Sequence, residues 1–173
     1  EPLRGGFLVT DGHHNRVLWV RPNGLISEFI AFGNIVPTGL EVHGKTVYMA
    51  QAGQSPHTPE DGSKVISIDA KSRATADVGQ GAPLLVDVET GLGRTLFALA
   101  QGEWNGAFPG APANPDGGSL VKINSNGSFT EIAGGLNLPT SLEFIGNSAY
   151  IVNLVGEIWV IEDVSQPPFG VAQ

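Results

Sequence analysis

The fold is decided by a stretch that occurs twice. It reads Pro37-Thr38-Gly39-Leu40-Glu41-Val42-His43-Gly44-Lys45-Thr46-Val47-Tyr48, and it returns as Pro139-Thr140-Ser141-Leu142-Glu143-Phe144-Ile145-Gly146-Asn147-Ser148-Ala149-Tyr150. Proline, threonine, leucine, glutamate, glycine and tyrosine recur in register. A diverged third copy lies between them at 83–88 and 93–97. Such self-similarity predicts a repeat architecture.

Around these copies, each repeat reads as four short strands and no helix. Alternation of apolar and polar residues marks the third strand of each repeat, and Asn-Gly turns such as Asn23-Gly24 and Asn126-Gly127 introduce the fourth. The predicted first strands are 38–43, 84–89 and 140–145, and the second strands are 6–10, 46–50, 95–100 and 149–152. The third strands are 16–20, 64–68, 120–123 and 157–161, and the fourth strands are 25–30, 74–78 and 128–133.

Four-stranded antiparallel units of about 40–50 residues are typical of β-propeller blades. The sequence therefore predicts an all-β partial propeller with blades at 1–36, 37–82, 83–138 and 139–173. The first blade lacks its first strand and the fourth lacks its last, which leaves about three and a half blades. A solenoid of stacked hairpins is the alternative fold.

An arc of this size leaves two unpaired sheet edges, which folded proteins avoid. We expect the chain to be a piece of a longer polypeptide whose remaining half completes the ring, or to pair with a second copy. Ten residues are expected to be buried between blades: Val17, Trp19, Leu40, Val42, Leu120, Ile123, Leu142, Phe144, Ile158 and Val160.

Composition excludes several classes of function. The net charge is −8 and no cluster of Lys or Arg is present, which argues against nucleic acid as a partner. No apolar run approaches the roughly 20 residues of a membrane-spanning helix. The chain has no cysteine, so disulfides, thiolate metal sites and cysteine nucleophiles are absent.

Several runs resemble the ScyD/ScyE family. They are Asp11-Gly12-His13-His14-Asn15-Arg16-Val17-Leu18, Val36-Pro37-Thr38-Gly39-Leu40, Gly118-Ser119-Leu120-Val121-Lys122-Ile123 and Leu138-Pro139-Thr140-Ser141-Leu142. Members are bacterial propellers related in shape to NHL repeats and to the gluconolactonase and strictosidine-synthase-like group. The resemblance implies a secreted or periplasmic protein, of which this chain is the C-terminal half. It implies no defined activity.

Two connections, at 52–63 and 101–118, are longer than the others and are expected on one face of the propeller. The second carries Trp104 and Phe108, a mixture of aromatic and polar residues suited to sugar rings or flat apolar ligands. The predicted ligand-binding residues are Thr38, Gln51, Glu103, Trp104, Thr140 and Asn153. In the structural alternative, Trp104 and Phe108 fold back and seal the top of the blade.

Three carboxylates, Glu41, Asp87 and Glu143, are assigned to one repeat position and are expected to hold a calcium-like divalent cation if they face the channel. The gluconolactonase resemblance implies carboxylate ligands together with an asparagine, but Thr38 and Thr140 stand where the asparagine is expected. In the alternative, the carboxylates cap backbone amides. The histidines form no metal motif.

No arrangement of a nucleophile with its base stands out, so the catalytic residues are unassigned. Three functions remain open. The first is an exported binding or scaffold propeller that recognises a small molecule or a partner protein on its loop face. The second is a metal-dependent lactonase or hydrolase of the gluconolactonase type, and the third is a purely structural module.

Overall fold

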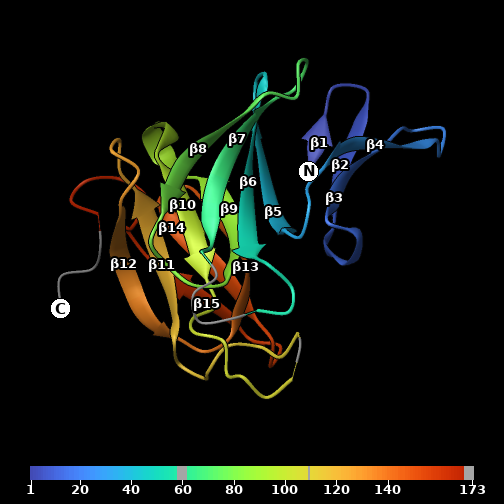
Figure 1. Ribbon diagram of the computed structural model, residues 1–173. Coiled ribbons are helices and arrows are strands. Elements are labelled where there is room, and N and C mark those ends of the chain that lie inside the picture. Colours follow the sequence, from blue (N-terminus) through green and yellow to red (C-terminus); the bar gives the residue numbers. More distant parts are fainter. Residues whose placement is uncertain (58–61, 109, 170–173) are drawn as a thin grey trace.

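The computed structural model describes residues 1–57, 62–108 and 110–169 and shows an all-β chain (Figure 1). These residues form fifteen β-strands in four antiparallel sheets, together with two 3₁₀ turns, η1 (Gly12–His14) and η2 (Leu92–Arg94). Strand order within each sheet follows chain order, so every sheet is a meander. Within the described ranges, no helix is long and apolar enough to cross a membrane.

The first sheet contains four strands: β1 (Pro2–Leu3), β2 (Gly6–Asp11), β3 (Arg16–Val20) and β4 (Ile26–Ala31). The prediction that this sheet lacks its first strand is wrong, because Pro2 pairs with Phe7 and Leu3 with Gly6. Gly5 forms the turn between them with φ +88°, which favours glycine. Two residues are too few for an alternating pattern to be visible in the sequence.

The other three sheets follow the predicted repeats. The second contains β5 (Val36–His43), β6 (Thr46–Gly53), β7 (Lys64–Asp69) and β8 (Thr75–Gln80), and the third contains β9 (Leu85–Thr90), β10 (Leu96–Ala100), β11 (Gly118–Ile123) and β12 (Phe129–Leu136). The fourth contains only β13 (Pro139–Ile145), β14 (Ser148–Asn153) and β15 (Ile158–Ile161). Residues 58–61 and 109 of the predicted loops, and 170–173 of the last predicted blade, lie outside the described residues.

Neighbouring sheets pack face to face through three apolar cores. Leu8 and Val17 of the first sheet pack on Val47 and Ile68 of the second. A core around Ala50, Val65, Ala98 and Val121 joins the second sheet to the third, and one around Phe97, Leu120, Leu142 and Ile151 joins the third to the fourth. The inner strand β5 contacts β9, and β9 in turn contacts β13, so these three strands lie around a common centre (Figure 1).

A bulge recurs at the same place in the first three sheets. The pairing of the third strand with the fourth shifts register after Val17, Val65 and Leu120. An extra residue in the outer strand increases its local twist. The repeat is therefore conserved in backbone detail that the side-chain pattern does not reveal.

The predicted core is correct for the inner sheets and wrong at one end of the molecule. Val17, Leu40, Leu120 and Leu142 are buried, whereas Trp19, Val42, Ile123 and Phe144 are half-buried. Ile158 and Val160 are 67% and 49% exposed, contrary to the prediction. Residues alternate between the faces of a strand, and these two lie on the face of the fourth sheet that no other described sheet covers.

Candidate functional site

The two long connections emerge at one end of the sheets, because β6 and β10 run in the same direction along neighbouring sheets. Gln101, the first residue of the second connection, anchors it. The Gln101 side chain donates to the carbonyl of Pro139 at 3.2 Å and accepts from the amide of Ala113 at 3.0 Å. Since Gln101 is buried, these bonds fix the connection against the start of β13. We call this end of the molecule the loop face.

Trp104 and Phe108, the two aromatic residues of this connection, behave differently. Trp104 is half-buried, pairs with Ala113 through an isolated β-bridge, and packs on a small apolar cluster that includes Ala52 and Leu84. Phe108 is 60% exposed. Trp104 therefore folds back onto the sheets, as the structural alternative predicts, while Phe108 does not.

Two ring nitrogens in this region, one on Trp104 and one on His57, lack hydrogen-bond partners. The indole Nε1 of Trp104 and the imidazole Nδ1 of His57 are buried, and neither has a hydrogen-bond partner among the described residues. The two rings lie edge to face with centroids 6.4 Å apart. Buried polar groups are normally hydrogen-bonded, so two unpaired nitrogens on neighbouring rings are unusual and mark this region as a candidate site.

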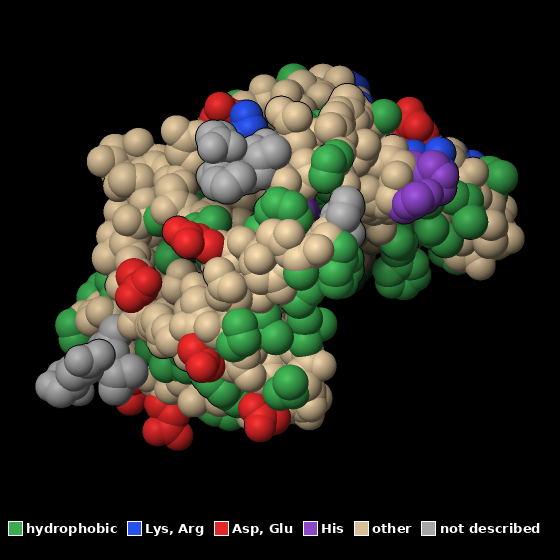
Figure 2. Space-filling model, turned by 60° about the horizontal axis from the view of Figure 1, so that its bottom comes forward, with side chains coloured by type: hydrophobic (Ala, Val, Ile, Leu, Met, Phe, Trp, Pro, Cys, Tyr) green, Lys and Arg blue, Asp and Glu red, His purple; other side chains and the backbone are tan. Residues whose placement is uncertain are grey.

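A cavity of about 460 Å³ opens on the same face, between the second and third sheets. Its polar lining includes Glu103, Asn114, Ser119 and Glu131, and the ring of Phe129 forms part of its apolar wall. Figure 2 brings this end of the molecule forward, and in the lower half of the view the charged side chains that the structure describes are acidic. The loop face thus combines aromatic surface with acceptor oxygens.

The structure places the six predicted ligand-binding residues as follows. Glu103 lines the cavity, and Trp104, the next residue in the sequence, packs on the apolar cluster of Ala52 and Leu84. The hydroxyls and amide of three others are already engaged within the protein. Thr38 Oγ1 lies within hydrogen-bond distance of the carbonyls of Ala50 and Leu85 and donates its one proton to either. Thr140 Oγ1 donates to the carbonyl of Val152, and Asn153 binds both the backbone and the side chain of Glu157. Gln51 is buried. Their role in binding stays a prediction.

The repeat alignment of the acidic residues needs one correction. Glu41 pairs with Tyr48 and Glu143 with Tyr150, but the residue of β9 that pairs with the corresponding Phe97 is Glu89. Asp87 instead pairs with Leu99. The error arises because the third copy begins two residues later than its proline suggests. Glu41, Glu89 and Glu143 therefore occupy one position on three inner strands.

Burial and repulsion from nearby carboxylates shift the pKa of Glu89 strongly. Burial, followed by repulsion from Glu41, Asp87, Glu143 and Glu1, raises the pKa of Glu89 to about 9. Burial is also the largest cause that raises the pKa of Glu1, to which Glu41 and Glu143 contribute. The inner strands therefore bring their carboxyls close enough to repel one another.

Asp87 has a structural role. Its carboxylate accepts from the amides of Val88 at 3.0 Å and Leu142 at 2.8 Å, which ties β9 to β13. Burial raises the pKa of Asp87 to about 6 against these lowering bonds. Gly39 lies against this carboxyl, and a Cβ there would be 2.1 Å from Asp87 Oδ1. For Asp87, the alternative of capping backbone amides is confirmed.

Within the described ranges, no three His, Asp or Glu side chains converge in a group that could hold a metal ion. His13 and His14 stack edge to face at 4.8 Å, and His14 Nδ1 lies 3.0 Å from the Asp11 carboxylate, which Arg16 also binds. Those bonds lower the pKa of Asp11. Asp11 and its partners fix the turn η1 and the start of β3.

No known family profile matches the sequence, and no curated protein matches it. Among solved structures, a chain of a nidogen/laminin complex aligns with 90% of this chain at a TM-score of 0.68 and 11% identity. The fold is a β-propeller. A streptogramin B lyase aligns with 92% at a TM-score of 0.50 and 12% identity. In both cases the propeller chain described here spans 54% of the matched chain.

Sequence reasoning missed several residues of the propeller's loop face and centre. They are His57, Asn114, Ser119, Phe129, Glu131 and Glu89. Tyr48 and Tyr150 each follow their glutamate by seven residues, but Phe97 follows Glu89 by eight, so the longer turn of the third repeat hides Glu89 from a count along the sequence. The others come from separate blades, and only the packed structure places them together.

Proposed function

We propose that the protein is an exported β-propeller that binds a small molecule or a partner protein on its loop face. The observation that carries this proposal is the pair of buried, unpaired nitrogens on Trp104 and His57. Leaving a buried donor without a partner costs about 1–3 kcal/mol. A ligand that offers hydrogen-bond acceptors over an aromatic ring, such as a sugar or a flat polar ring, recovers this free energy.

The neighbouring cavity supports the same function. It supplies the carboxylates of Glu103 and Glu131, which accept hydrogen bonds from hydroxyl groups, and the ring of Phe129 for apolar contact. Ligand sites are typically concave and combine apolar walls with a few polar groups. Among the neighbours in fold, one chain comes from a nidogen/laminin complex and another is a lyase. The fold alone therefore supports a scaffold and leaves the function to the site.

The family proposal extends this function. The motifs at 11–18, 36–40, 118–123 and 138–142 resemble the ScyD/ScyE family, and we assign the chain to the C-terminal half of such a propeller. Membership implies a secreted or periplasmic location. The absence of cysteine is compatible with that location, and the 54% coverage of both matched chains agrees with half of a complete ring.

The proposed partner is the part that completes this ring, either the remaining half of the same polypeptide or a second copy. Phe7 and Val9 of β2 are exposed on the outer face of the first blade. Val152, Ile158 and Val160 are exposed on the outer face of the fourth. Between neighbouring blades of this chain, the equivalent faces are buried in apolar cores.

Replacing Trp104 by Phe tests the binding site. Calorimetric titration with a panel of neutral oligosaccharides and flat aromatic compounds is expected to give saturable binding with the wild type. Trp104→Phe keeps an aromatic ring but removes the indole N–H, so affinity is expected to fall about tenfold. Trp159→Phe is the control, because Trp159 Nε1 is already bonded to Glu157. Equal affinity of the wild type and Trp104→Phe would contradict the proposal.

A metal-dependent lactonase is the second candidate, and the raised pKa of Glu89 favours it. The described carboxylates do not converge into a ready-made metal site, so a calcium-like cation would have to draw Glu41, Glu89 and Glu143 together. Bound there, it would relieve their repulsion and could polarise a carbonyl or activate water. The binding proposal predicts no micromolar calcium affinity in a calorimetric titration. Micromolar binding that disappears in the double variant Glu41→Gln, Glu143→Gln would favour the lactonase, with Asp116→Asn as the control.

A further inference from the structure

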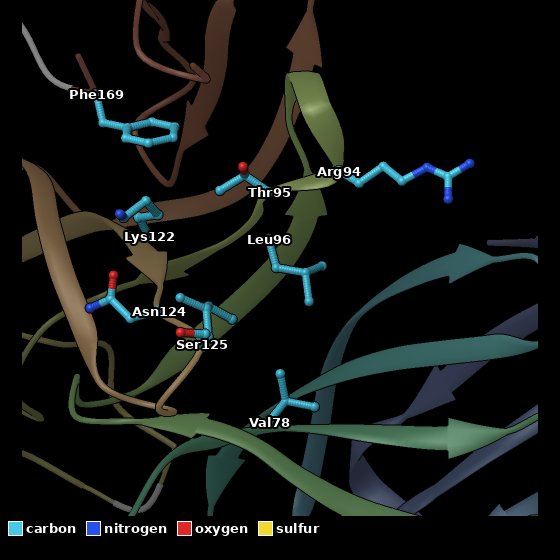
Figure 3. A pocket seen from close by; sticks show the side chains of 9 residues that line it. Val78, Arg94, Thr95, Leu96, Lys122, Asn124, Ser125 and Phe169 are labelled. Atoms are coloured by element: carbon cyan, nitrogen blue, oxygen red, sulfur yellow. The ribbon is translucent and has the colours of Figure 1, made fainter. Parts of the chain in front are cut away.

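The opposite end of the blades carries a second groove between the second and third blades. β10 starts at this end and β11 ends there, whereas the loop face lies at the end of β10 and the start of β11. A cavity of about 540 Å³ is bounded by apolar and polar residues of both blades (Figure 3). A second cavity of about 270 Å³ adjoins it, and the two share Arg94 and Leu96.

The charges that line this groove are unusual for this chain. The protein has nine Lys and Arg residues and a net charge of −8, yet Arg94 and Lys122 both line the larger cavity. Among residues 1–57, 62–108 and 110–169, no Asp or Glu lines either cavity. Neither Arg94 nor Lys122 forms a salt bridge with any residue that the structure describes. The groove is therefore a local concentration of unneutralised positive charge.

The two cations serve different parts of the groove. Figure 3 shows the Arg94 side chain extending away from Lys122, and Arg94 also lines the smaller cavity with His43, Thr46, Tyr48 and Thr90. The Lys122 ammonium lies 4.5 Å from the centre of the Phe169 ring. Arg94 thus shares the smaller cavity with residues that carry hydroxyl and imidazole groups, while Lys122 lies beside the Phe169 ring in the larger cavity.

Two further observations indicate that the smaller cavity is built for a ligand. Thr90 Oγ1 is buried and has no hydrogen-bond partner among the described residues, so a hydroxyl donor lies unused in its lining. Arg94 has φ +65°, a left-handed conformation that a non-glycine residue rarely adopts. Such strain concentrates at functional positions. Arg94 is one of the two residues that line both cavities.

We propose that this groove binds a small oxyanion attached to an apolar body, a carboxylate or a phosphate ester. The guanidinium of Arg94 binds the oxyanion, because its planar fork matches the geometry of carboxylate and phosphate groups. The Thr90 hydroxyl donates to the same group. The apolar body lies in the larger cavity against Leu96, and Lys122 adds a second positive charge.

Four probes of similar size test the charge and shape of the ligand: benzoate, phenyl phosphate, benzyl alcohol and benzylamine. Binding is followed by NMR chemical-shift perturbation on the whole chain. Benzoate or phenyl phosphate is expected to shift signals of Thr95, Leu96 and Lys122 with a Kd of about 1 mM or tighter, and the stronger of the two identifies the oxyanion. Benzyl alcohol and benzylamine are expected to bind at least tenfold more weakly. Equal binding of benzylamine overturns the proposal.

Three variants locate the site. Arg94→Gln is expected to weaken binding of the anionic probe about tenfold or more, because a hydrogen bond to a charged group is lost. Thr90→Val is expected to weaken it severalfold without destabilising the fold, since the hydroxyl makes no internal bond. Arg4→Gln removes the same charge from an exposed turn of the first blade. If Arg4→Gln weakens binding as much as Arg94→Gln, or if Arg94→Gln binds like the wild type, the proposal is wrong.

Discussion

At the scale of single residues, the most constrained group is the Asp87 carboxyl at the centre of the inner strands. It is 8% exposed and accepts two backbone amides, one of them on the next blade. Its pKa rises from 3.8 to about 6 because burial outweighs these bonds. A folded-state pKa above the unfolded value means that the folded protein binds this proton more tightly. The contribution of Asp87 to the free energy of unfolding is then fully present below about pH 4 and is lost as the pH rises through 6.

Replacing Asp87 by Asn tests this coupling. The free energy of unfolding of the wild type, from urea denaturation, is expected to include a loss of about 3 kcal/mol from this group between about pH 3 and pH 7. Asp87→Asn is expected to lack that fall, whatever its absolute stability, while Asp116→Asn, an exposed carboxyl, retains it. Glu89, with a pKa of about 9, extends the loss to higher pH, so Glu89→Gln is expected to flatten the curve above pH 6. An unchanged slope in Asp87→Asn would contradict the assignment.

At the scale of strands and turns, the sequence predicts the repeating units well but their register less well. Alternating residues such as Val17, Val65 and Leu120 locate the third strands correctly, because burial of one face leaves a clear pattern. The third inner strand was misaligned because Pro83 resembles Pro37 and Pro139. In the structure, Leu84 and Leu138 share a left-handed conformation, with φ +47° and +46°, and the inner strand starts after each.

The candidate site was predictable only in part, for a related reason. The connection that carries Glu103 and Trp104 can be identified from the sequence, because it is much longer than the other turns between predicted strands. It does not show that His57 of the second blade lies beside Trp104 of the third, since this contact depends on how the blades pack. The basic groove was missed for the same reason. Arg94 and Lys122 lie on different elements, η2 and β11, and only the packed structure brings both into the lining of one cavity.

At the scale of the whole molecule, we propose that this chain is an open arc of a propeller and associates with further blades. Its inner faces bury apolar cores, whereas its two outermost faces expose Phe7, Val9, Val152, Ile158 and Val160. Exposed apolar faces and unpaired strand edges of this kind promote association. The outer face of the fourth blade would pack on a face such as that of the first, as neighbouring blades do within the chain.

Sedimentation velocity of the 173-residue chain tests this claim most directly. We expect association beyond the 18.1 kDa monomer, with the sedimentation coefficient rising with protein concentration. The double variant Ile158→Lys, Val160→Lys is expected to shift the population toward monomer without loss of β-sheet content, since both side chains are already exposed. Glu162→Lys, an exposed control just beyond β15, should associate like the wild type. A stable, fully folded monomer of 18.1 kDa at all concentrations would contradict the account.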